Sequence, residues 1–265
     1  KSMKLQAAFN HMHIFLDPTP DPAASWAERK RLFDLPRSTW EDYSGDLISD
    51  GGGIYSRGAK SVPLSPQVQS MLGVHDEDLS GDELIRAILR MEADLLWNGG
   101  IGTYIKGTHE TDRQAADPSN DNVRVDASEL KFRVVGEGGN LGFTQAARVE
   151  YARGGGRLNT DAVDNSGGVD MSDHEVNLKI LSQDLMAAGE IDRVQRDALL
   201  AEVAMDVSKD VCADNHEHSL GLSLDVVRSV DALDDFRVLL NDLVAERDID
   251  LKRHVLPEDG ALLRR

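Results

Sequence analysis

The sequence contains one cysteine, Cys212, in 265 residues, and no apolar run approaches the roughly 20 residues of a membrane-spanning helix. A single cysteine excludes an internal disulfide and favours a reducing compartment. The first residues, KSMKLQAAFNHMH, have neither the apolar core nor the small-residue cleavage site of a signal peptide. These absences predict a cytoplasmic protein.

Basic residues are also in deficit, with 29 Lys and Arg against 47 Asp and Glu, a formal charge of −18. Non-specific binding to nucleic acid or to an anionic membrane requires a basic face, so neither is predicted as a partner. The hydrophobic fraction of 40% and charged fraction of 29% fit a soluble globular protein. The length allows one large domain or two ordinary ones.

No leading element precedes the first strand-like run of the chain. The sequence opens almost directly on KLQAAFN, whereas the ends of a domain usually carry some frayed residues. We therefore expect a piece of a longer protein.

Up to about residue 170, short apolar runs alternate with helical patterns. The expected strands are Leu5–Phe9, Ile14–Leu16, Asp94–Trp97, Phe132–Val135 and Arg157–Asn159. The expected helices are Ala23–Phe33, Pro66–Leu72, Gly81–Met91 and Thr144–Ala152, and the polar stretch 108–127 is expected to be a loop. This alternation is typical of a mainly parallel sheet, whose ligands bind beyond the carboxyl ends of the strands. Those ends carry NHMH, NGGIGT, GEGGN and NTD.

Beyond residue 170 the pattern becomes helical. Val176, Ile180, Leu181 and Leu185 fall near one face of a first helix, for which Gly189 is a suitable C-cap. Residues 190–215 and 229–248 predict two further amphipathic helices, and Pro257–Gly260 predicts a turn. We interpret this part as a helical scaffold.

The glycine clusters do not match the dinucleotide fingerprint G-x-G-x-x-G. Gly136 and Gly138 are followed by Leu141 at the required third position, and NGGIGTY fails in the same way. A tight turn that needs positive φ is the simpler explanation of each cluster taken singly.

A second polar cluster lies at residues 164–177, DNSGGVDMSDHEVN. Its amides and hydroxyls beside Gly167 and Gly168 suit recognition of a carboxamide or carboxylate. The alternative is an ordinary helix start capped by Ser172 or Asp173.

No metal site or catalytic nucleophile is predicted. His11 and His13 share a strand face but supply only two ligands, and the position four after His174 is Leu178 rather than histidine. G-x-S-x-G is absent, and Cys212 lies in a pattern that indicates helix packing.

The order of these motifs resembles the cofactor domain of glutamate dehydrogenases, especially the large bacterial NAD-specific enzymes. In compact members a strand ends in E-G-A-N before a helix with Thr, a second strand ends in Pro-Asp, and N-A-G-G-V-x-x-S follows. Here the series reads GEGGN with Thr144, NTD at 159–161 and NSGGVDMS at 165–172, in the same order and spacing. DLLWNGGIGTYIK resembles the preceding strand, and AAFNHMHIFLDP onwards is similar to the large enzymes. The resemblance covers residues 1 to about 185 well and the remainder loosely.

This resemblance implies a role for each matching residue. Asn140 matches an asparagine of the family that contacts the cofactor. Asn165 matches an asparagine placed near the nicotinamide and the substrate. Ser172 matches a serine that contacts the substrate's distal carboxylate. The implied cofactor-binding residues are Asn10, Asn98, Gly99, Gly100, Gly138, Asn140 and Asn165, and the implied substrate-binding residues are Ser172 and Asn165. Asn10 stands where an acidic residue usually binds ribose, which leaves NAD against NADP open, and Asp17 is the alternative.

The implied fold class is α/β. A Rossmann-like nucleotide-binding domain over residues 1–170, with a mainly parallel sheet that lacks its first strand, precedes a C-terminal helical region over 171–265. The implied reaction is NAD-dependent oxidative deamination of L-glutamate to 2-oxoglutarate and ammonium, in a cytoplasmic homo-oligomer. The fingerprint glycines and the catalytic lysine and aspartate are expected upstream of residue 1. No catalytic residue is therefore assigned within the chain, and the isolated chain is expected to be inactive.

Two other interpretations stay open. The first is another amino-acid dehydrogenase of the same superfamily. Ser172 and the N-terminal run argue against this interpretation. A non-catalytic nucleotide-binding or scaffold module is the other. The lack of a lysine in a catalytic motif favours such a module, but an upstream lysine explains that lack equally well.

Overall fold

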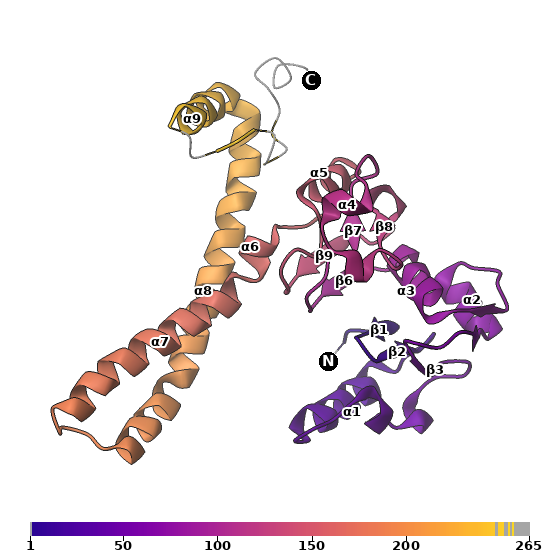
Figure 1. The fold of residues 1–265 in the computed structure, drawn as a ribbon, viewed down its shortest axis with the longest axis horizontal. Helices are drawn as coiled ribbons and strands as arrows, with labels where there is room; N and C mark the ends of the chain where they lie inside the picture. Colours follow the sequence, from indigo (N-terminus) through magenta and orange to yellow (C-terminus); the bar gives the residue numbers. More distant parts are fainter. Residues whose placement is uncertain (1, 247–248, 252–253, 255, 257–265) are drawn as a thin grey trace. The chain divides into compact units, whose positions relative to one another are not determined.

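The computed structural model describes residues 2–246, 249–251, 254 and 256, and the turn predicted at Pro257–Gly260 lies outside them. The chain divides into two compact units, and Figure 1 labels their helices and strands in chain order. Unit 1 comprises Lys1–Leu96, Thr103–Val134 and Glu150–Gly156, and unit 2 comprises Trp97–Gly102, Val135–Val149 and Arg157–Arg265. Among the described helices, none combines the length and the apolar character needed to cross a bilayer.

The first sheet, in unit 1, is antiparallel. It contains β1 (Ala7–Phe9), β2 (His13–Leu16) and β3 (Gly53–Ser56), in the order β1-β2-β3, with Phe15 of β2 opposite Ile54 of β3. The prediction of a mainly parallel sheet is therefore wrong for this part of the chain. A connection of only three residues between β1 and β2 reverses the chain but cannot form the crossover that parallel strands need.

Aromatic packing builds the core beside this sheet. Phe15 is fully buried, and its ring stacks on Trp40 with the ring centroids 4.7 Å apart and contacts Tyr43 at 5.1 Å. Helix α1 (Pro22–Asp34) adds the buried Leu32 to the cluster. Its first turn is capped by Asp21, whose carboxylate accepts hydrogen bonds from two backbone amides of that turn.

The rest of unit 1 consists of short elements around helix α3 (Gly81–Arg90). A capping box between Ser80 and Glu83 starts this helix, which buries Leu84, Ile85 and Leu89. Around it lie α2 (Pro66–Leu72), the antiparallel pair β4 (Val62–Pro63) and β5 (Asp78–Leu79), and the parallel pair β7 (Ile105–Lys106) and β8 (Val125–Asp126).

The polar stretch predicted as a loop at 108–127 contains α4 (Asp112–Ala115) and β8 and is held by one buried arginine. The guanidinium of Arg124 donates to the Thr103 carbonyl at 2.9 Å and to the carboxylates of Asp112 and Asp121 at 2.8 and 2.6 Å. A buried charge satisfied on several sides can order a polar segment that has few apolar contacts.

Strands β6 (Leu95–Asn98) and β9 (Val134–Glu137) pair with each other. The backbone amide of Val134 donates to the Asp94 carbonyl, and the amide of Gly139 donates to the Asn98 carbonyl. The residue numbers of the partners increase together, so the two strands run in the same direction. The pair is therefore parallel, as predicted for this region, and the carboxyl ends of both strands lie at one edge. Arg157 contributes a single bridge, its carbonyl accepting from the Val135 amide, in place of the strand predicted there.

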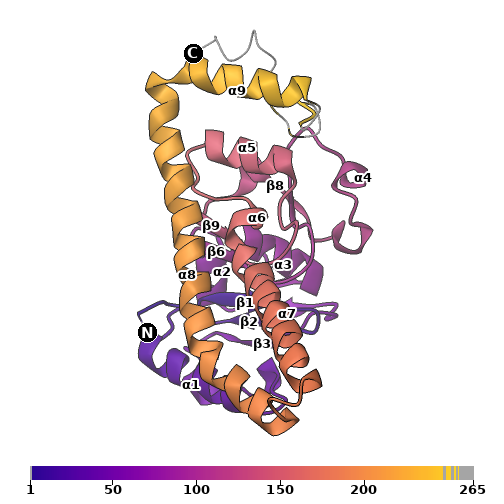
Figure 2. The same ribbon diagram turned by 90° about the vertical axis from the view of Figure 1, so that its left-hand side faces the viewer.

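Unit 2 continues into helices. After α5 (Gln145–Arg153), which spans the boundary of the units, come α6 (Asp161–Asp164), α7 (Ser166–Ala187), α8 (Arg193–Asp231) and α9 (Leu233–Ala245). Helices α7 and α8 run side by side (Figure 2). Helix α7 has Ala188 as its C-cap, and Gly189, predicted as the C-cap, follows it with φ of 73°.

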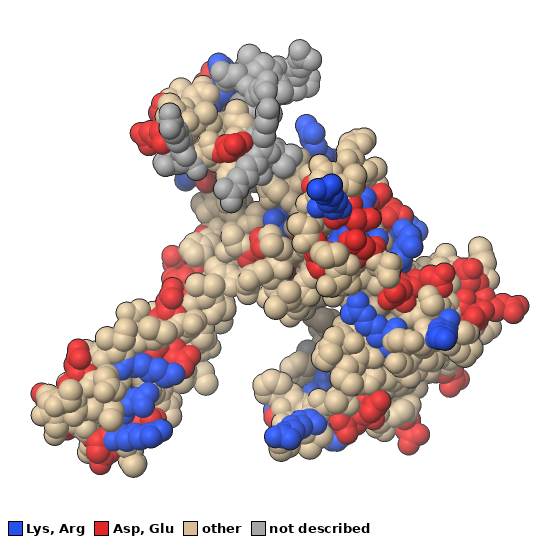
Figure 3. Space-filling view, in the orientation of Figure 1, with Lys and Arg blue, Asp and Glu red and all other residues tan. Residues whose placement is uncertain are grey.

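The apolar face predicted for α7 is open in this chain. Val176, Ile180 and Leu181 are 50% to 61% exposed. Acidic and basic side chains are interspersed over α7 and α8 on the face drawn in Figure 3.

Candidate functional site

Glycines at the ends of β6 and β9 allow a tryptophan ring and a neighbouring strand to approach the backbone. A Cβ atom at Gly136 or Gly138 would lie 2.7 or 2.4 Å from the ring of Trp97, and one at Gly139 would lie 2.2 Å from the Gly100 carbonyl oxygen. The glycines of GEGGN are needed for close approach, because the positive φ of this loop, 56°, belongs to Leu141. The tight-turn interpretation of this cluster is therefore wrong.

Gly100 differs from its neighbours because its environment is open. A Cβ atom built there meets no heavy atom within 4 Å. The backbone of β6 is thus accessible just past the strand end, where a ligand could lie against it.

A buried ion pair fixes the β9 end. Glu137 is fully buried, and its carboxylate accepts hydrogen bonds from Nε and Nη2 of Arg148 at 2.7 and 2.9 Å. The backbone amide of Phe143 donates to the same carboxylate at 3.2 Å. Arg148 also pairs with Asp161 at 2.8 Å. Burial lowers the pKa of Arg148, but the bond to Glu137 and the nearby negative charges outweigh that effect and raise it.

The carboxylates of Asp161 and Asp164, at the two ends of α6, connect that helix to β9 and to the loop after it. Asp161 accepts a hydrogen bond from the Leu141 amide at 2.8 Å, and Asp164 accepts one from the Glu137 amide at 2.9 Å. Asn159 donates to the other oxygen of Asp164 at 3.1 Å. The loop that carries Asn140 is therefore held at several points along its length.

Two predicted site residues meet directly in this arrangement. Nδ2 of Asn165 donates a hydrogen bond to Oδ1 of Asn140. Asn165 precedes the first residue of α7 and has right-handed helical φ and ψ. Gly168 and Ser172 follow it three and seven residues later, so the three positions share one helix face over about 10 Å. Gly168 and Ser172 are both exposed on that face.

The start of α7 corrects one interpretation of the 164–177 cluster. Because the helix begins at Ser166, Gly167 and Gly168 lie in its first turn, and Ser172 lies within the helix. Neither Ser172 nor Asp173 is the N-cap.

Asn98 lies at the end of β6, where it was predicted. Its carbonyl accepts the Gly139 amide, and its buried Nδ2 has no hydrogen-bond partner among the residues that the structure describes. A Cβ atom at Gly142 would lie 1.7 Å from that nitrogen, so a glycine is required opposite the amide.

Asn10 and its alternative Asp17 belong to unit 1, whereas the other predicted site residues belong to unit 2. Oδ1 of Asn10 accepts hydrogen bonds from the amides of Met12 and His13 at 2.8 and 2.7 Å, which closes the turn between β1 and β2. Asp17 is fully buried, and one of its carboxylate oxygens accepts the Ser49 amide at 3.2 Å. Local structure alone thus explains why an asparagine stands at position 10.

Sequence reasoning missed the charged residues that position the site. Glu137 was visible only as one letter of GEGGN, and Arg148 and Asp161 belong to segments 11 and 24 residues further on. A signal did exist: an acidic residue enclosed by glycines at a buried strand end requires a basic partner.

Residues 1–225 match the family model described as "Bacterial NAD-glutamate dehydrogenase, catalytic domain". The chain is 50% identical over 263 residues to the NAD-specific glutamate dehydrogenase of Halomonas elongata. It is 48% identical to the proteins of the same name from Pseudomonas aeruginosa, over 263 residues, and Mycobacterium tuberculosis, over 271 residues. These alignments cover 99% to 100% of the chain but only 16% to 17% of each relative.

Proposed function

Because the chain belongs to the family of bacterial NAD-glutamate dehydrogenases, we propose that it forms part of the cofactor and substrate site of such an enzyme. The reaction would be oxidative deamination of L-glutamate to 2-oxoglutarate and ammonium, with NAD reduced to NADH. The relatives named for this activity are about six times longer than the chain, so the activity would belong to a longer polypeptide.

One observation carries the proposal: the hydrogen bond that joins Asn140, beyond the end of β9, to Asn165 at the start of α7. It links the loop at the strand ends to a helix face that presents an amide, a glycine and the hydroxyl of Ser172. Directed amide and hydroxyl groups beside exposed backbone suit a carboxamide or a carboxylate.

These residues fit the nicotinamide and ribose end of NAD better than its pyrophosphate. Gly100 offers open backbone, whereas a Cβ atom at Gly99 would lie 3.0 Å from the Trp97 ring, and Asn140 offers an exposed amide for hydrogen bonds to hydroxyl or carboxamide groups. Arg148 is engaged by two carboxylates, so its charge is already neutralised. When bound, NAD would accept the hydride.

The protein groups would then act by position. Asn165 would orient the nicotinamide and the substrate, and Ser172, two turns further along the same helix face, would hold the distal carboxylate of glutamate. Fixing both partners on one rigid helix makes the transfer effectively intramolecular, which can lower a barrier by several kcal/mol.

Gly100→Ala in the full-length enzyme tests where the cofactor lies. The new methyl group meets no heavy atom of the described residues within 4 Å, so the melting temperature should stay unchanged. A cofactor lying on that backbone would meet the methyl group, and NADH affinity should fall at least about tenfold, or about 1.4 kcal/mol. Gly45→Ala, which is equally open but in unit 1, is the matched control and should bind NADH normally.

Steady-state kinetics test the two polar residues. Asn165→Ala should sharply lower kcat for NADH formation, because it removes an orienting contact, whereas Ser172→Ala should mainly raise the KM for glutamate. Wild-type kinetics in both variants, with unchanged NADH binding in Gly100→Ala, would refute the proposal.

A further inference from the structure

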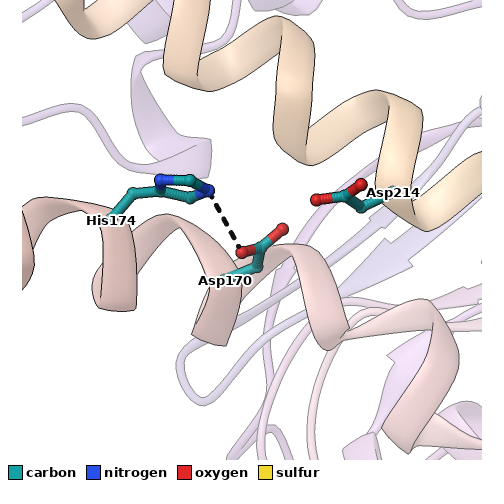
Figure 4. Close-up of side chains that lie close together, drawn as sticks. All are labelled: Asp170, His174 and Asp214. Atoms are coloured by element: carbon teal, nitrogen blue, oxygen red, sulfur yellow. Dashed lines mark ion pairs between the residues drawn. The ribbon is translucent and has the colours of Figure 1, made fainter.

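A cluster of three metal-ligating side chains lies between α7 and α8, outside the site described above. Asp170 and His174 come from α7 and Asp214 from α8, and one ligand atom from each lies within 4.8 Å of the others (Figure 4). Nε2 of His174 is 3.5 Å from Oδ1 of Asp170. The ring and both carboxylates point into the same space between the helices.

The backbone around this cluster is fixed by contacts on the neighbouring faces. Asp170 and His174 are four residues apart, which places them on one side of α7. On α8, Asn215 donates hydrogen bonds through Nδ2 to the Val163 carbonyl at 2.7 Å and to Ser166 Oγ at 3.0 Å. Because Asn215 follows Asp214 directly, the contact that ties α8 to the start of α7 also positions the third ligand.

The charges at the cluster favour a bound cation. Within the described residues, neither Asp170 nor Asp214 is paired with a lysine or an arginine. Two carboxylates held this close repel each other unless a positive charge lies between them. Asp170 and His174 are half-buried, which weakens screening of that repulsion by water.

The donor set indicates which cation fits. Oxygen-only ligand sets suit Mg²⁺ and Ca²⁺, whereas an imidazole nitrogen with carboxylate oxygens suits first-row transition metals. Zn²⁺ binds such ligands at about 2.1 Å, so ligand atoms around a tetrahedral ion lie about 3.4 Å apart. The His174–Asp170 pair, at 3.5 Å, already has this spacing. Asp214 is exposed and can close the remaining distance by rotating its side chain.

We propose that Asp170, His174 and Asp214 bind a divalent first-row transition metal ion such as Zn²⁺, which joins α7 to α8. Three protein ligands leave one position for water. Ser172, two residues from both α7 ligands, points to a different side of the helix, so this site is separate from the proposed glutamate contact. Prediction from sequence found no metal site because its ligands come from two helices 40 residues apart.

Calorimetric titration of the full-length protein with ZnCl2, after removal of metals by a chelator, tests the site. The wild-type protein should bind one more equivalent of Zn²⁺ than its His174→Ala variant. The Asp214→Asn variant, which keeps the size of the side chain, should bind that equivalent at least tenfold more weakly. His216→Ala, an exposed histidine of the same helix, is the matched control and should titrate as wild type.

Circular dichroism and the melting temperature without metal show whether each variant keeps its fold. Zn²⁺ should raise the melting temperature of the wild type and of His216→Ala and leave His174→Ala unaffected. Should His174→Ala fail to fold, Asp170→Asn and Asp214→Asn provide the same comparison. Equal stoichiometry and affinity in wild type and folded ligand variants would overturn the proposal, as would equal loss in the His216→Ala control.

Discussion

Replacing Arg148 by Met should destabilise the protein far more than an ordinary loss of an ion pair. The substitution keeps most of the aliphatic volume but leaves Glu137, which is fully buried, with the Phe143 amide as its remaining partner described above. Two bonds to Glu137 and one ion pair with Asp161 are lost together. Removing one member of a buried pair typically costs about 3–5 kcal/mol, because a charge is left without compensation. We expect a loss in that range.

The matched control is Arg133→Met. Arg133 also binds a carboxylate, that of Asp94, at 2.9 Å, but the two side chains are 80% and 84% exposed. Exposed pairs contribute about 0–1 kcal/mol. Guanidinium unfolding curves of both variants, with the wild type alongside, give the two free-energy differences. A loss for Arg148→Met no larger than that for Arg133→Met would refute the reasoning from burial.

Three further predictions concern local features. Gly139→Ala should lower the free energy of unfolding by about 1–3 kcal/mol, because its Cβ would collide with a backbone oxygen, whereas Gly45→Ala has open space; equal chemical denaturation curves for the two variants would contradict this. The side chain of Arg31 donates hydrogen bonds to Glu28 and lowers the pKa of the Glu28 carboxyl from 4.5 to about 2, although burial alone would raise that pKa. Stability from this depressed carboxyl pKa is present above about pH 4.5 and lost as the pH falls towards 2. Glu28→Gln should therefore flatten the decline of the melting temperature over that range, and an unchanged slope would exclude the effect. Ser80→Ala should cost about 1 kcal/mol in thermal unfolding through loss of the α3 cap, and a loss below about 0.3 kcal/mol would count against it.

Much of the local structure follows from the sequence because its causes are local. The helices predicted at Ala23–Phe33, Pro66–Leu72 and Gly81–Met91 appear within one residue at each end, since caps and apolar periodicity fix them. The antiparallel turn at Asn10 is also a local feature, because the Asn10 side chain accepts hydrogen bonds from the amides of Met12 and His13, but the alternation of strands and helices along the chain does not reveal it.

The arrangement at the site depends on distant residues. Asn140 and Asn165 could be singled out from their motifs, but their hydrogen bond could not, because the two residues are 25 positions apart and the segment between them must fold to bring them together. The positions of both depend on the ion pairs that Arg148 forms with Glu137 and Asp161. No regular spacing in the sequence indicates that these three residues interact. A pattern can therefore identify the side chains that face a ligand before it identifies those that hold them in place.

The tryptophan over the β9 glycines has an evolutionary consequence. Because the Trp97 ring occupies the space of a side chain at Gly136 and again at Gly138, neither glycine can gain a side chain while the ring stays in place. A lineage that replaces the indole by a smaller group gains room for alanine at either glycine, whereas a lineage that keeps it does not. Among relatives of this chain, the residue at position 97 should therefore covary with those at 136 and 138, even where the intervening Glu137 stays constant.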